Sequence, residues 1–458
     1  MNKGILGIDL GTSSVKLLLR FDNGEIRKAK CAYEEKTPKG WLDAVSKTFA
    51  EFKGVEIKAI GLSSQVGTYI INEKDVISWD TGVGKEELEE IKQAHISDEF
   101  IREIDMPHPD IISYPIPRLM YIKKHFENIK TVCQPKDYLC KVLTGNLVTD
   151  QYSYRGLIHT RKAEYSDFFL NEIGIDENIL PKIIPYNQIA GVTTAECEKL
   201  IGIPTGIPVY TGLNDFFASV FGMDIQNAGD MFDITGTSEH LGVLTDTLER
   251  DTKMVSGVYL GNFIHYGVTA SSGASLTFAL KELETENLNI KECLENKPPL
   301  FTPYLNGERA PIFDSDARGL FFGIKSACTN RDMAYSVLEG VVFSLYHIYE
   351  SMGKPEFKFI TVSGGAAENG ILNTLKAEMF GKDILTLSEN DTSALGAVKV
   401  ATMALNPDIL QFNSVKEIVS PTGEFKEILN KRYEIYKNLY PCLKQQFKNF
   451  SNIGKELI

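Results

Sequence analysis

The sequence predicts an α/β protein made of two related domains. An apolar strand that ends in Asp, a turn containing Gly, Thr and Ser, and a second apolar strand occupy Gly4–Leu19. A similar segment, Met231–Leu244, begins near the middle of the chain. A repeat at this long spacing indicates two similar domains and not a solenoid. The 458 residues also exceed what one hydrophobic core normally supports, and two domains of ordinary size fit them.

The composition narrows the class of protein. Hydrophobic residues at 43% and charged residues at 24% exclude wholesale disorder. A net charge of −13 without a basic run argues against nucleic acid or an anionic membrane as a partner. The seven cysteines contain no C-x-x-C pair and are typical of reduced thiols, so we expect a cytoplasmic location. The sequence offers no signal peptide, transmembrane stretch, P-loop or clustered metal motif.

The first hairpin has the residues of a phosphate site. Gly11 tolerates a positive φ and lets the backbone turn sharply, and we expect Thr12 and Ser13 to place donors on one concave edge, which suits a phosphate. Asp9 ends the first strand, and a carboxylate beside a phosphate repels it unless a cation lies between them. Asp9 therefore predicts a Mg²⁺ site, and Lys16 on the second strand is placed to reach the phosphates. The alternative is an ordinary hairpin with a capped turn.

Two further segments of the first half place polar groups after buried strands. The strand that begins at Lys58 runs into a polar turn, and another strand leads to Trp79 and Asp80. Ligands meet α/β sheets at such turns, so Gln65, Trp79 and Asp80 are pocket candidates, although core packing explains Trp79 equally well. In Gly206–Gly222 a strand and a Gly turn lead to Asp215 at a helix N-cap. Asp215 is either a simple cap or a catalytic base.

The second half continues the α/β pattern after its hairpin. The small residues of the turn Thr269–Ser275 permit a ligand to approach the backbone closely. A long irregular segment rich in charge, Pro303–Gly323, precedes a helix over residues 331–352. A buried strand then enters the turn Gly364-Gly365-Ala366, and Asn369 begins the next helix. A strand over 382–387, a helix over 393–405 and only helices beyond Pro407 complete the prediction.

In this order the motifs resemble the FGGY family of carbohydrate kinases, and the closest branch is xylulokinase-like. The segments that carry the resemblance are Gly7–Ser13, Gly212–Asp215, Gly236–Ser238, Tyr304–Gly323, Gly364–Ala366 and Ala394–Ala397, with Lys136–Leu139 and Leu143–Gly145 similar to that branch. The resemblance implies two actin/Hsp70/hexokinase-like (ribonuclease H-like) domains with a catalytic cleft between them. It implies an N-terminal domain over 1–228 that binds sugar and supplies the base, and a C-terminal domain over 229–458 that binds ATP.

The resemblance also implies the activity and its residues. An ATP-dependent kinase would transfer the γ-phosphate to a hydroxyl of a small, pentulose-type sugar or of a polyol, with ATP and Mg²⁺ as cofactors. Asp9 would lie near Mg²⁺, Asp215 would be the base, and the nucleotide would contact Gly11, Thr12, Ser13, Lys16, Gly236, Thr237, Gly273, Gly365, Ala366 and Asn369. The sugar would contact Gln65, Trp79, Asp80, Asn214 and Asp215. A homodimer is a further, open expectation.

The sequence departs from the xylulokinase pattern where the sugar is expected. Gln65-Val66-Gly67 replaces a Gln-Met-His-Gly run and lacks the His, and Trp79–Val83 lacks the Arg of Trp-Asn-Asp-Gly-Arg. Phe216 and Phe217 follow Asp215 where small residues are usual. We therefore expect D-xylulose to be a poor substrate compared with some other pentulose, deoxysugar or polyol. The alternatives are a kinase of another substrate such as glycerol or a deoxyketose, an actin- or Hsp70-like ATPase module acting on a protein partner, and an inactive sugar sensor.

Overall fold

The computed structural model describes residues 3–107, 111–250, 254–283, 285, 288–407 and 411–456. The chain forms two compact units. The first comprises residues 1–224, 257–261 and 391–413, and the second comprises 225–256, 262–390 and 414–458. Each unit draws on separate segments of the chain, so these units are not the same division as the continuous domains 1–228 and 229–458, which stay a prediction.

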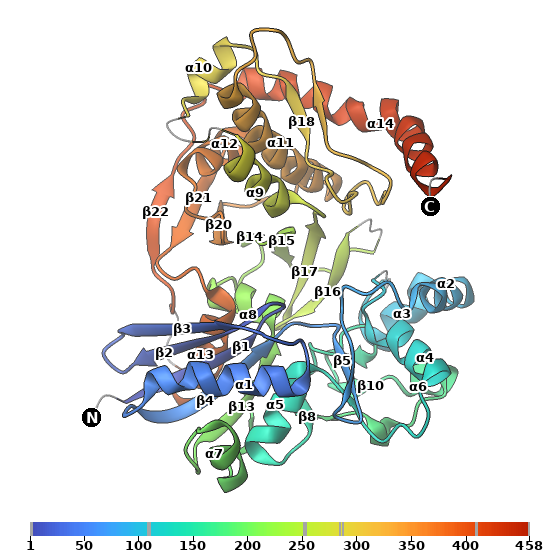
Figure 1. The fold of residues 1–458 in the computed structure, drawn as a ribbon, viewed down its shortest axis with the longest axis vertical. Helices are drawn as coiled ribbons and strands as arrows, with labels where there is room; N and C mark the ends of the chain where they lie inside the picture. Colours follow the sequence, from blue (N-terminus) through green and yellow to red (C-terminus); the bar gives the residue numbers. More distant parts are fainter. Residues whose placement is uncertain are drawn as a thin grey trace. The chain divides into compact units, whose positions relative to one another are not determined.

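The first unit contains a six-stranded sheet in the order β12-β13-β4-β1-β2-β3 (Figure 1). These strands span Ile189–Val192, Pro208–Asn214, Glu56–Ser64, Lys3–Leu10, Ser14–Phe21 and Ile26–Ala32. Because β1 and β13 both run parallel to β4, their carboxyl ends meet at one edge of the sheet. In that register Asp9 lies opposite Ser63, and Asn214 lies opposite Ser64. The sheet alone therefore brings together three segments that the sequence analysis singled out.

Helices α1 (Pro38–Phe49), α8 (Asp215–Gly222) and α13 (Thr392–Leu405) pack with this sheet. Glycine allows α13 to approach the sheet closely, because a Cβ at Gly61 would lie 1.8 Å from the carbonyl oxygen of Ala397. The remaining helices and 3₁₀ turns of the unit are α2 (Lys85–Ala94), α3 (Ser97–Ile104), α4 (Pro115–His125), α5 (Pro135–Thr144), α6 (Asp167–Ile173), α7 (Ala195–Ile201), Ala50–Phe52 and Glu177–Ile179.

Short strands complete the first unit. Strands β5 (Tyr69–Ile71), β6 (Asp75–Ile77) and β7 (Val132–Cys133) form a three-stranded sheet, and β8 (Val148–Thr149) pairs with β11 (Lys182–Ile183). Strands β9 (Ile158–His159) and β10 (Glu164–Tyr165) form a further pair. The segment Trp79–Asp80 therefore follows a small separate sheet and not the main one.

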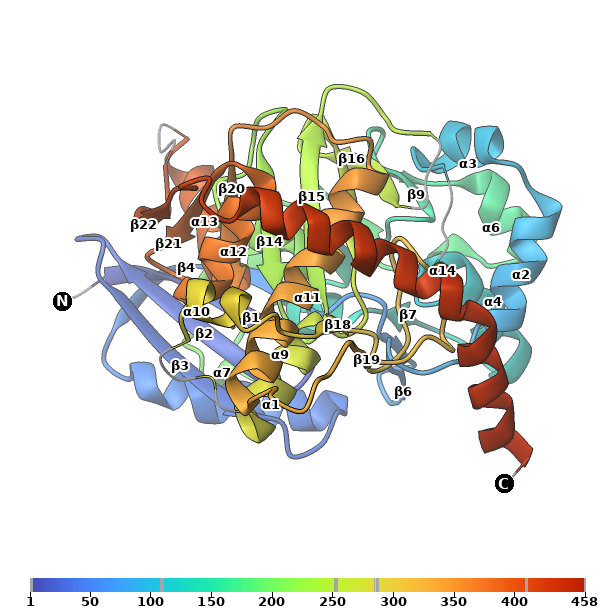
Figure 2. The ribbon, with the colours of Figure 1, turned by 90° about the horizontal axis from the view of Figure 1, so that it is seen from above.

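The second unit is built on a seven-stranded sheet in the order β16-β17-β15-β14-β20-β21-β22, of which part of β16 is assigned to the first unit. The strands span Val255–Tyr259, Asn262–Val268, Glu239–Thr245, Met231–Thr235, Phe359–Gly364, Asp383–Leu387 and Val415–Val419. Helices α9 (Ser272–Glu282), α10 (Ile290–Glu295), α11 (Asn330–Ser351), α12 (Gly370–Phe380) and α14 (Lys426–Glu456) accompany it, with the strand pair β18 (Leu300–Thr302) and β19 (Leu320–Phe322). Figure 2 shows α14 crossing α11.

Both predicted hairpins are confirmed, because β1 pairs antiparallel with β2 and β14 pairs antiparallel with β15. The expectation of helices alone beyond Pro407 is wrong, since Val415–Val419 forms the edge strand β22. The residues of this short strand are mostly exposed. The strand therefore does not need the alternation of apolar and polar residues by which a half-buried strand is recognised in a sequence. Within the described residues, no helix is both long and apolar enough to cross a membrane.

Candidate active site

Asp9 lies at the carboxyl end of β1, where neutral groups hold its carboxylate. The hydroxyl of Ser63 donates to Oδ1 at 2.9 Å, and the hydroxyl of Ser393 donates to Oδ2 at 2.6 Å. Burial raises the pKa of Asp9, while the hydrogen bond from Ser393 and the positive charge of Lys16 oppose the rise. The two hydroxyls orient the carboxylate without neutralising it, so Asp9 keeps lone pairs and a negative charge for a cation.

The turn after Asp9 is tight because the backbone folds back on itself at Gly11. Gly11 does not adopt the positive φ that glycine tolerates. Its N–H donates to the carbonyl oxygen of Ser14 at 3.1 Å, and a Cβ would lie 3.2 Å from the same oxygen. Closeness of the backbone therefore favours glycine here. Thr12 is half-buried and Ser13 is exposed, which leaves the turn accessible from solvent.

Asp215 is the first residue of α8, and the prediction that it is the N-cap is wrong. The cap is Asn214, whose side-chain oxygen accepts a hydrogen bond from the N–H of Phe217 at 3.0 Å. The half-buried Asp215 carboxylate accepts a hydrogen bond from the N–H of Phe216 at 2.8 Å. Burial, and then the negative charge of Asp9, raise the pKa of Asp215 to about 7. A carboxyl group that titrates near neutral pH is suited to accept a proton in catalysis.

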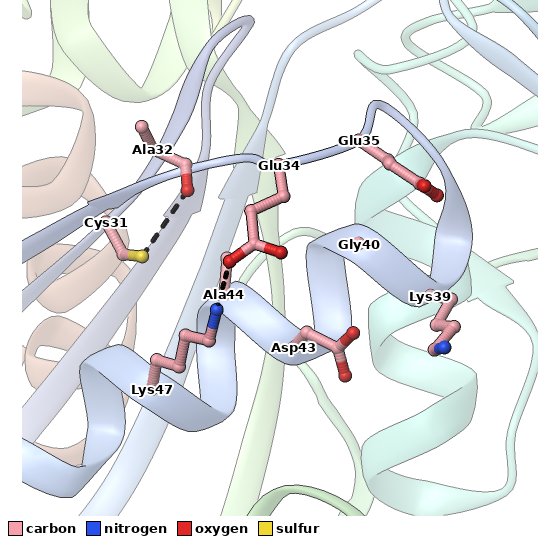
Figure 3. Close-up of a pocket in the computed structure, with 9 residues that line it drawn as sticks. All are labelled: Cys31, Ala32, Glu34, Glu35, Lys39, Gly40, Asp43, Ala44 and Lys47. Carbon is pink, nitrogen blue, oxygen red and sulfur yellow. Dashed lines mark hydrogen bonds and ion pairs between the residues drawn. The ribbon is translucent and has the colours of Figure 1, made fainter.

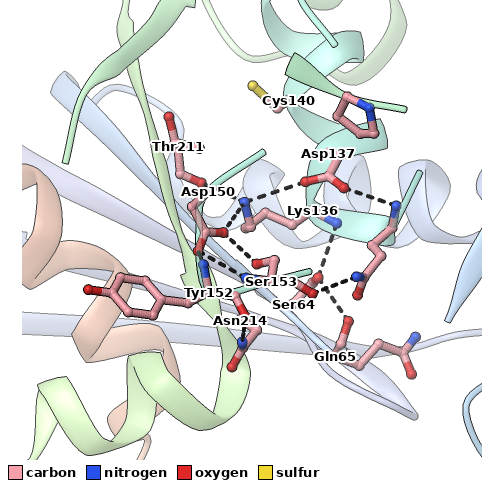
Figure 4. Close-up of polar contacts among 12 residues, drawn as sticks. Ser64, Gln65, Lys136, Asp137, Cys140, Asp150, Tyr152, Ser153, Thr211 and Asn214 are labelled. Atoms are coloured by element: carbon pink, nitrogen blue, oxygen red, sulfur yellow. Dashed lines mark hydrogen bonds and ion pairs between the residues drawn. The ribbon is translucent and has the colours of Figure 1, made fainter. Parts of the chain in front are cut away.

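A buried ionic network supports the Asn214–Asp215 turn (Figure 4). The Lys136 ammonium lies 2.9 Å from Asp150 Oδ2 and donates to the carbonyl oxygen of Thr211 on β13 at 3.2 Å. Asp150 also accepts hydrogen bonds from the N–H groups of Tyr152 and Ser153. The amide of Asn214 then donates to the carbonyl oxygen of Tyr152 at 3.3 Å. Lys136 and Asp150 were not predicted as site residues, because nothing in their sequence spacing pairs them.

Removal of the Lys136 charge should destabilise the protein strongly. Lys136 and its carboxylate neighbours Asp137 and Asp150 are at most 1% exposed. We expect Lys136→Met to lower the free energy of unfolding by about 3–5 kcal/mol, because two buried carboxylates lose their cation. Thermal and chemical denaturation measure this. Lys431→Met, which removes an exposed helical ion pair with Glu427, is the control and should change stability by less than about 1 kcal/mol. Equal effects of the two variants would contradict the prediction.

The sugar candidates lie in two places. Gln65 follows β4, is buried, and donates its N–H to the carbonyl oxygen of Leu10 at 2.8 Å, so it shares the sheet edge with Asp9.

Trp79 is partly exposed and Asp80 is exposed. Arg118, which the sequence analysis missed, holds their loop from α4: its guanidinium donates to Thr81 Oγ1 at 2.8 Å and to the carbonyl oxygen of Trp79 at 3.1 Å. Within the described part of the chain, no hydrogen bond or ion pair joins that loop to Asp215.

The nucleotide candidates of the second unit gather around the end of β14. A Cβ at Gly273, near the start of α9, would lie 1.8 Å from the carbonyl oxygen of Gly236, and the N–H of Ala274 donates to the carbonyl oxygen of Thr237 at 3.3 Å. The N–H of Gly365 donates to the carbonyl oxygen of Thr235 at 3.0 Å. Asn369, whose N–H donates to the carbonyl oxygen of Ala366 at 3.0 Å, caps α12. The six predicted residues therefore share one edge of this sheet.

Asp233 of the second hairpin differs from Asp9 in its partner. The Lys376 ammonium of α12 donates to Asp233 and, at 2.9 Å, to Glu239 Oε1, and all three side chains are at most 1% exposed. The carboxylates of Asp233 and Glu239 are therefore already paired with a lysine, so Asp9 is the better candidate to bind a cation. The described residues hold no group of three or more metal-ligating side chains. One carboxylate still fits Mg²⁺, since this ion commonly binds one or two carboxylates together with substrate phosphates.

A separate surface pocket contains none of the predicted site residues. It lies between the end of β3 and α1, has a volume of about 120 Å³, and is lined by Cys31, Ala32, Glu34, Glu35, Lys39, Gly40, Asp43, Ala44 and Lys47 (Figure 3). Its carboxylates and ammonium groups partly neutralise one another, as in the ion pair between Glu34 and Lys47. We assign no part of the candidate active site to it.

Comparisons with known proteins identify the class. Models of the N-terminal and C-terminal domains of the FGGY family of carbohydrate kinases match residues 4–222 and 232–405. The chain is 26% identical to a xylulose kinase of Lactococcus lactis, over 99% of this chain and 98% of the relative. It is 25% identical to a gluconokinase of Bacillus subtilis, over 100% and 99% of the two chains.

Solved structures share the fold. A ligand-bound xylulose kinase from Lactobacillus acidophilus superposes with a TM-score of 0.85 at 23% identity, covering 98% of this chain and 100% of that one. A glycerol kinase from Plasmodium falciparum with ADP gives a TM-score of 0.82 at 18% identity, over 96% and 98% of the chains. The fold is therefore the actin- and hexokinase-like α/β fold. The chain belongs to the FGGY family of carbohydrate kinases, and the protein is a sugar kinase.

Proposed function

We propose that this kinase transfers the γ-phosphate of ATP to a hydroxyl of a small pentulose-type sugar or polyol, with Asp215 as the general base. The observation that carries the proposal is the half-buried Asp215 carboxyl at the start of α8, whose pKa is raised to about 7. A base with this pKa is half ionised near neutral pH and still binds a proton well. Such general-base assistance typically contributes about 10²–10⁴-fold to a rate.

The other groups of the first unit suit the remaining demands of phosphoryl transfer. Charge on the transferred phosphate must be neutralised, and the hydroxyl must be held in line with it. In this proposal Asp215 takes the proton of the attacking hydroxyl and Asn214 helps to orient the sugar. Lys16 and the N–H groups of the turn Gly11-Thr12-Ser13 bind phosphate oxygens. The Lys136 network keeps the turn that carries Asp215 in place.

Asp9 is the proposed ligand of Mg²⁺, and it is supported by hydroxyl partners that leave its charge available. When bound, the ion would supply positive charge to the phosphates. In the second unit we propose Gly236, Thr237 and Gly273 for the phosphates, because the backbone there is free of bulky side chains. We propose Gly365, Ala366 and Asn369 for the adenosine end.

The proposed sugar residues are Gln65, Trp79, Asp80, Asn214 and Asp215. The His and Arg that the xylulokinase pattern carries at the Gln65 and Trp79 segments are both missing. Arg118 does not replace that Arg, because it is fully buried and its guanidinium donates hydrogen bonds to Trp79 and Thr81 of the loop itself. Loss of polar partners lowers discrimination for the hydroxyls that they would bind. We therefore propose a substrate other than D-xylulose.

A substrate panel tests this proposal. We expect ADP release to rise strongly with one or more ketoses, aldoses, sugar acids or polyols, and D-xylulose to give a lower kcat/KM than the best of them. ADP release without any acceptor, measured in parallel, is the control, because an ATPase acting on a protein partner would not need a sugar. D-xylulose as the best substrate of a broad panel would contradict the interpretation of the missing His and Arg. ADP release that no acceptor stimulates would contradict the proposed function.

The comparisons give no support to the protein-partner alternative, since the family and the named relatives are carbohydrate kinases. We further propose a cytoplasmic location. All seven cysteines are free thiols, which supports this proposal. The homodimer stays an expectation.

A further inference from the structure

A cation-rich cavity of about 130 Å³ lies beside the hairpin β2–β3 of the first unit. Lys16, Lys28, Lys30 and Asp391 are among its lining residues. Lys16 lies directly opposite Lys30 in the antiparallel register, and Lys28 is two residues further along the same face of β3. Like charges directly opposite each other repel, and Asp391 is the one carboxylate among the lining residues. The cavity therefore keeps an excess of positive charge, which suits a multiply charged anion.

Asp391 directs its carboxylate to these lysines and not to the helix that it begins. It occupies the N-cap position of α13, yet it makes no capping hydrogen bond within the described helix. Instead, Oδ1 lies 2.8 Å from the Lys16 ammonium and Oδ2 lies 3.2 Å from the Lys28 ammonium. About a third of each of the Lys16 and Asp391 side chains is exposed. An anion from solvent can therefore reach this ion pair.

We propose that Asp391 is an exchangeable counter-ion of Lys16. The polyphosphate of ATP displaces the Asp391 carboxylate from Lys16, while Asp391 stays paired with Lys28. The inference rests on the proposed role of Lys16 at the phosphates. A partly exposed ion pair contributes little free energy, whereas a phosphate group offers more charge and more acceptor oxygens than one carboxylate. The exchange keeps Lys16 paired before ATP arrives and lowers the affinity for the phosphate chain.

Titration calorimetry on the full-length protein tests the sign of this effect. We expect Asp391→Asn to bind ADP and ATP about two- to fivefold more tightly, because Lys16 no longer has to leave a carboxylate. Adenosine, which lacks phosphates, should bind with unchanged affinity. Asp391 makes no capping hydrogen bond with α13 and its ion pairs are partly exposed, so the melting temperature should stay near that of the wild type. Should Asp391→Asn fail to fold, Asp391→Ser, which also removes the charge and keeps a small polar side chain, takes its place. Unchanged or weaker ADP and ATP binding would overturn the inference.

A double-mutant cycle tests this inference separately from the proposed role of Lys16 on which it rests. Lys16→Gln alone should weaken ADP and ATP binding, and in that background Asp391→Asn should give no gain. If Asp391→Asn still tightened ADP and ATP binding without Lys16, the inference would be overturned, because Asp391 would then act by long-range repulsion of the phosphates and not through its contact with Lys16. A loss in Lys16→Gln without a gain in Asp391→Asn would overturn the inference and support the proposed role of Lys16. Unchanged affinity in Lys16→Gln would contradict that role and the inference together.

Discussion

Asp215→Asn is expected to lower turnover by about 10²-fold or more while ATP affinity stays near that of the wild type. Asn has nearly the same size as Asp but cannot accept the proton of the attacking hydroxyl. The helix cap is unaffected, because the cap of α8 is Asn214. Steady-state kinetics and a nucleotide titration on the purified variant measure the two effects. Turnover within a few-fold of the wild type would leave the proposed mechanism without its base.

A matched control is available in α6, where Asp167 also occupies the first helical position after a capping residue, Ser166. Asp167 is exposed, so Asp167→Asn should leave turnover within about twofold, as expected for a surface change. A large loss of turnover in both variants would point to helix stability and not to proton transfer.

The pH dependence gives a second readout of Asp215. The pKa in the folded protein, about 7, lies above the ordinary value of 3.8. The kcat/KM of the wild type should therefore fall below about pH 7 as Asp215 becomes protonated, and Asp215→Asn should lack this limb. Because folding raises the pKa, protonated Asp215 contributes to the stability of the folded protein below pH 3.8. This contribution is lost as the pH rises through 7. The variant should accordingly melt at a higher temperature than the wild type at pH 8, with a smaller difference towards acid pH.

Asp9→Asn is expected to lower Mg²⁺-dependent turnover by about 10²-fold or more, on the scale of losing transition-state charge stabilisation. The melting temperature should change little or rise, because burial already disfavours the charged form of Asp9 and Asn can still bond to the hydroxyls of Ser63 and Ser393. Activity measured against Mg²⁺ concentration, with a parallel melting curve, separates the two effects. Full turnover of the wild-type protein in excess chelator would contradict the prediction.

The second hairpin supplies the matched control for Asp9. Asp233→Asn removes the corresponding carboxylate but leaves Lys376 with Glu239, so it should alter stability more than it alters the dependence on Mg²⁺. If Asp233→Asn shifted the Mg²⁺ dependence as far as Asp9→Asn, the distinction drawn between the two aspartates would be wrong.

The two hairpins were predictable because each is encoded by contiguous residues. Asp at the end of an apolar strand, a turn of Gly, Thr and Ser, and a second strand define Gly4–Leu19 and Met231–Leu244 without reference to distant parts of the chain. The same local signals placed α8 after β13 and α12 after Asn369. They did not distinguish Asn214 from Asp215 as the cap, because both are good capping residues at adjacent positions.

Taken by itself, the sequence determined the α/β class, the repeat of the hairpin and the candidates Asp9, Lys16 and Asp215. Only the tertiary structure decided how their charges are held. Asp9 accepts a hydrogen bond from Ser393, 384 residues away, Lys136 binds Asp150, and Asp391 bridges Lys16 and Lys28. The physical reason is that the pKa and the availability of a carboxylate depend on burial and on the nearest opposite charges. Both are set by packing between distant segments, which local sequence patterns do not encode.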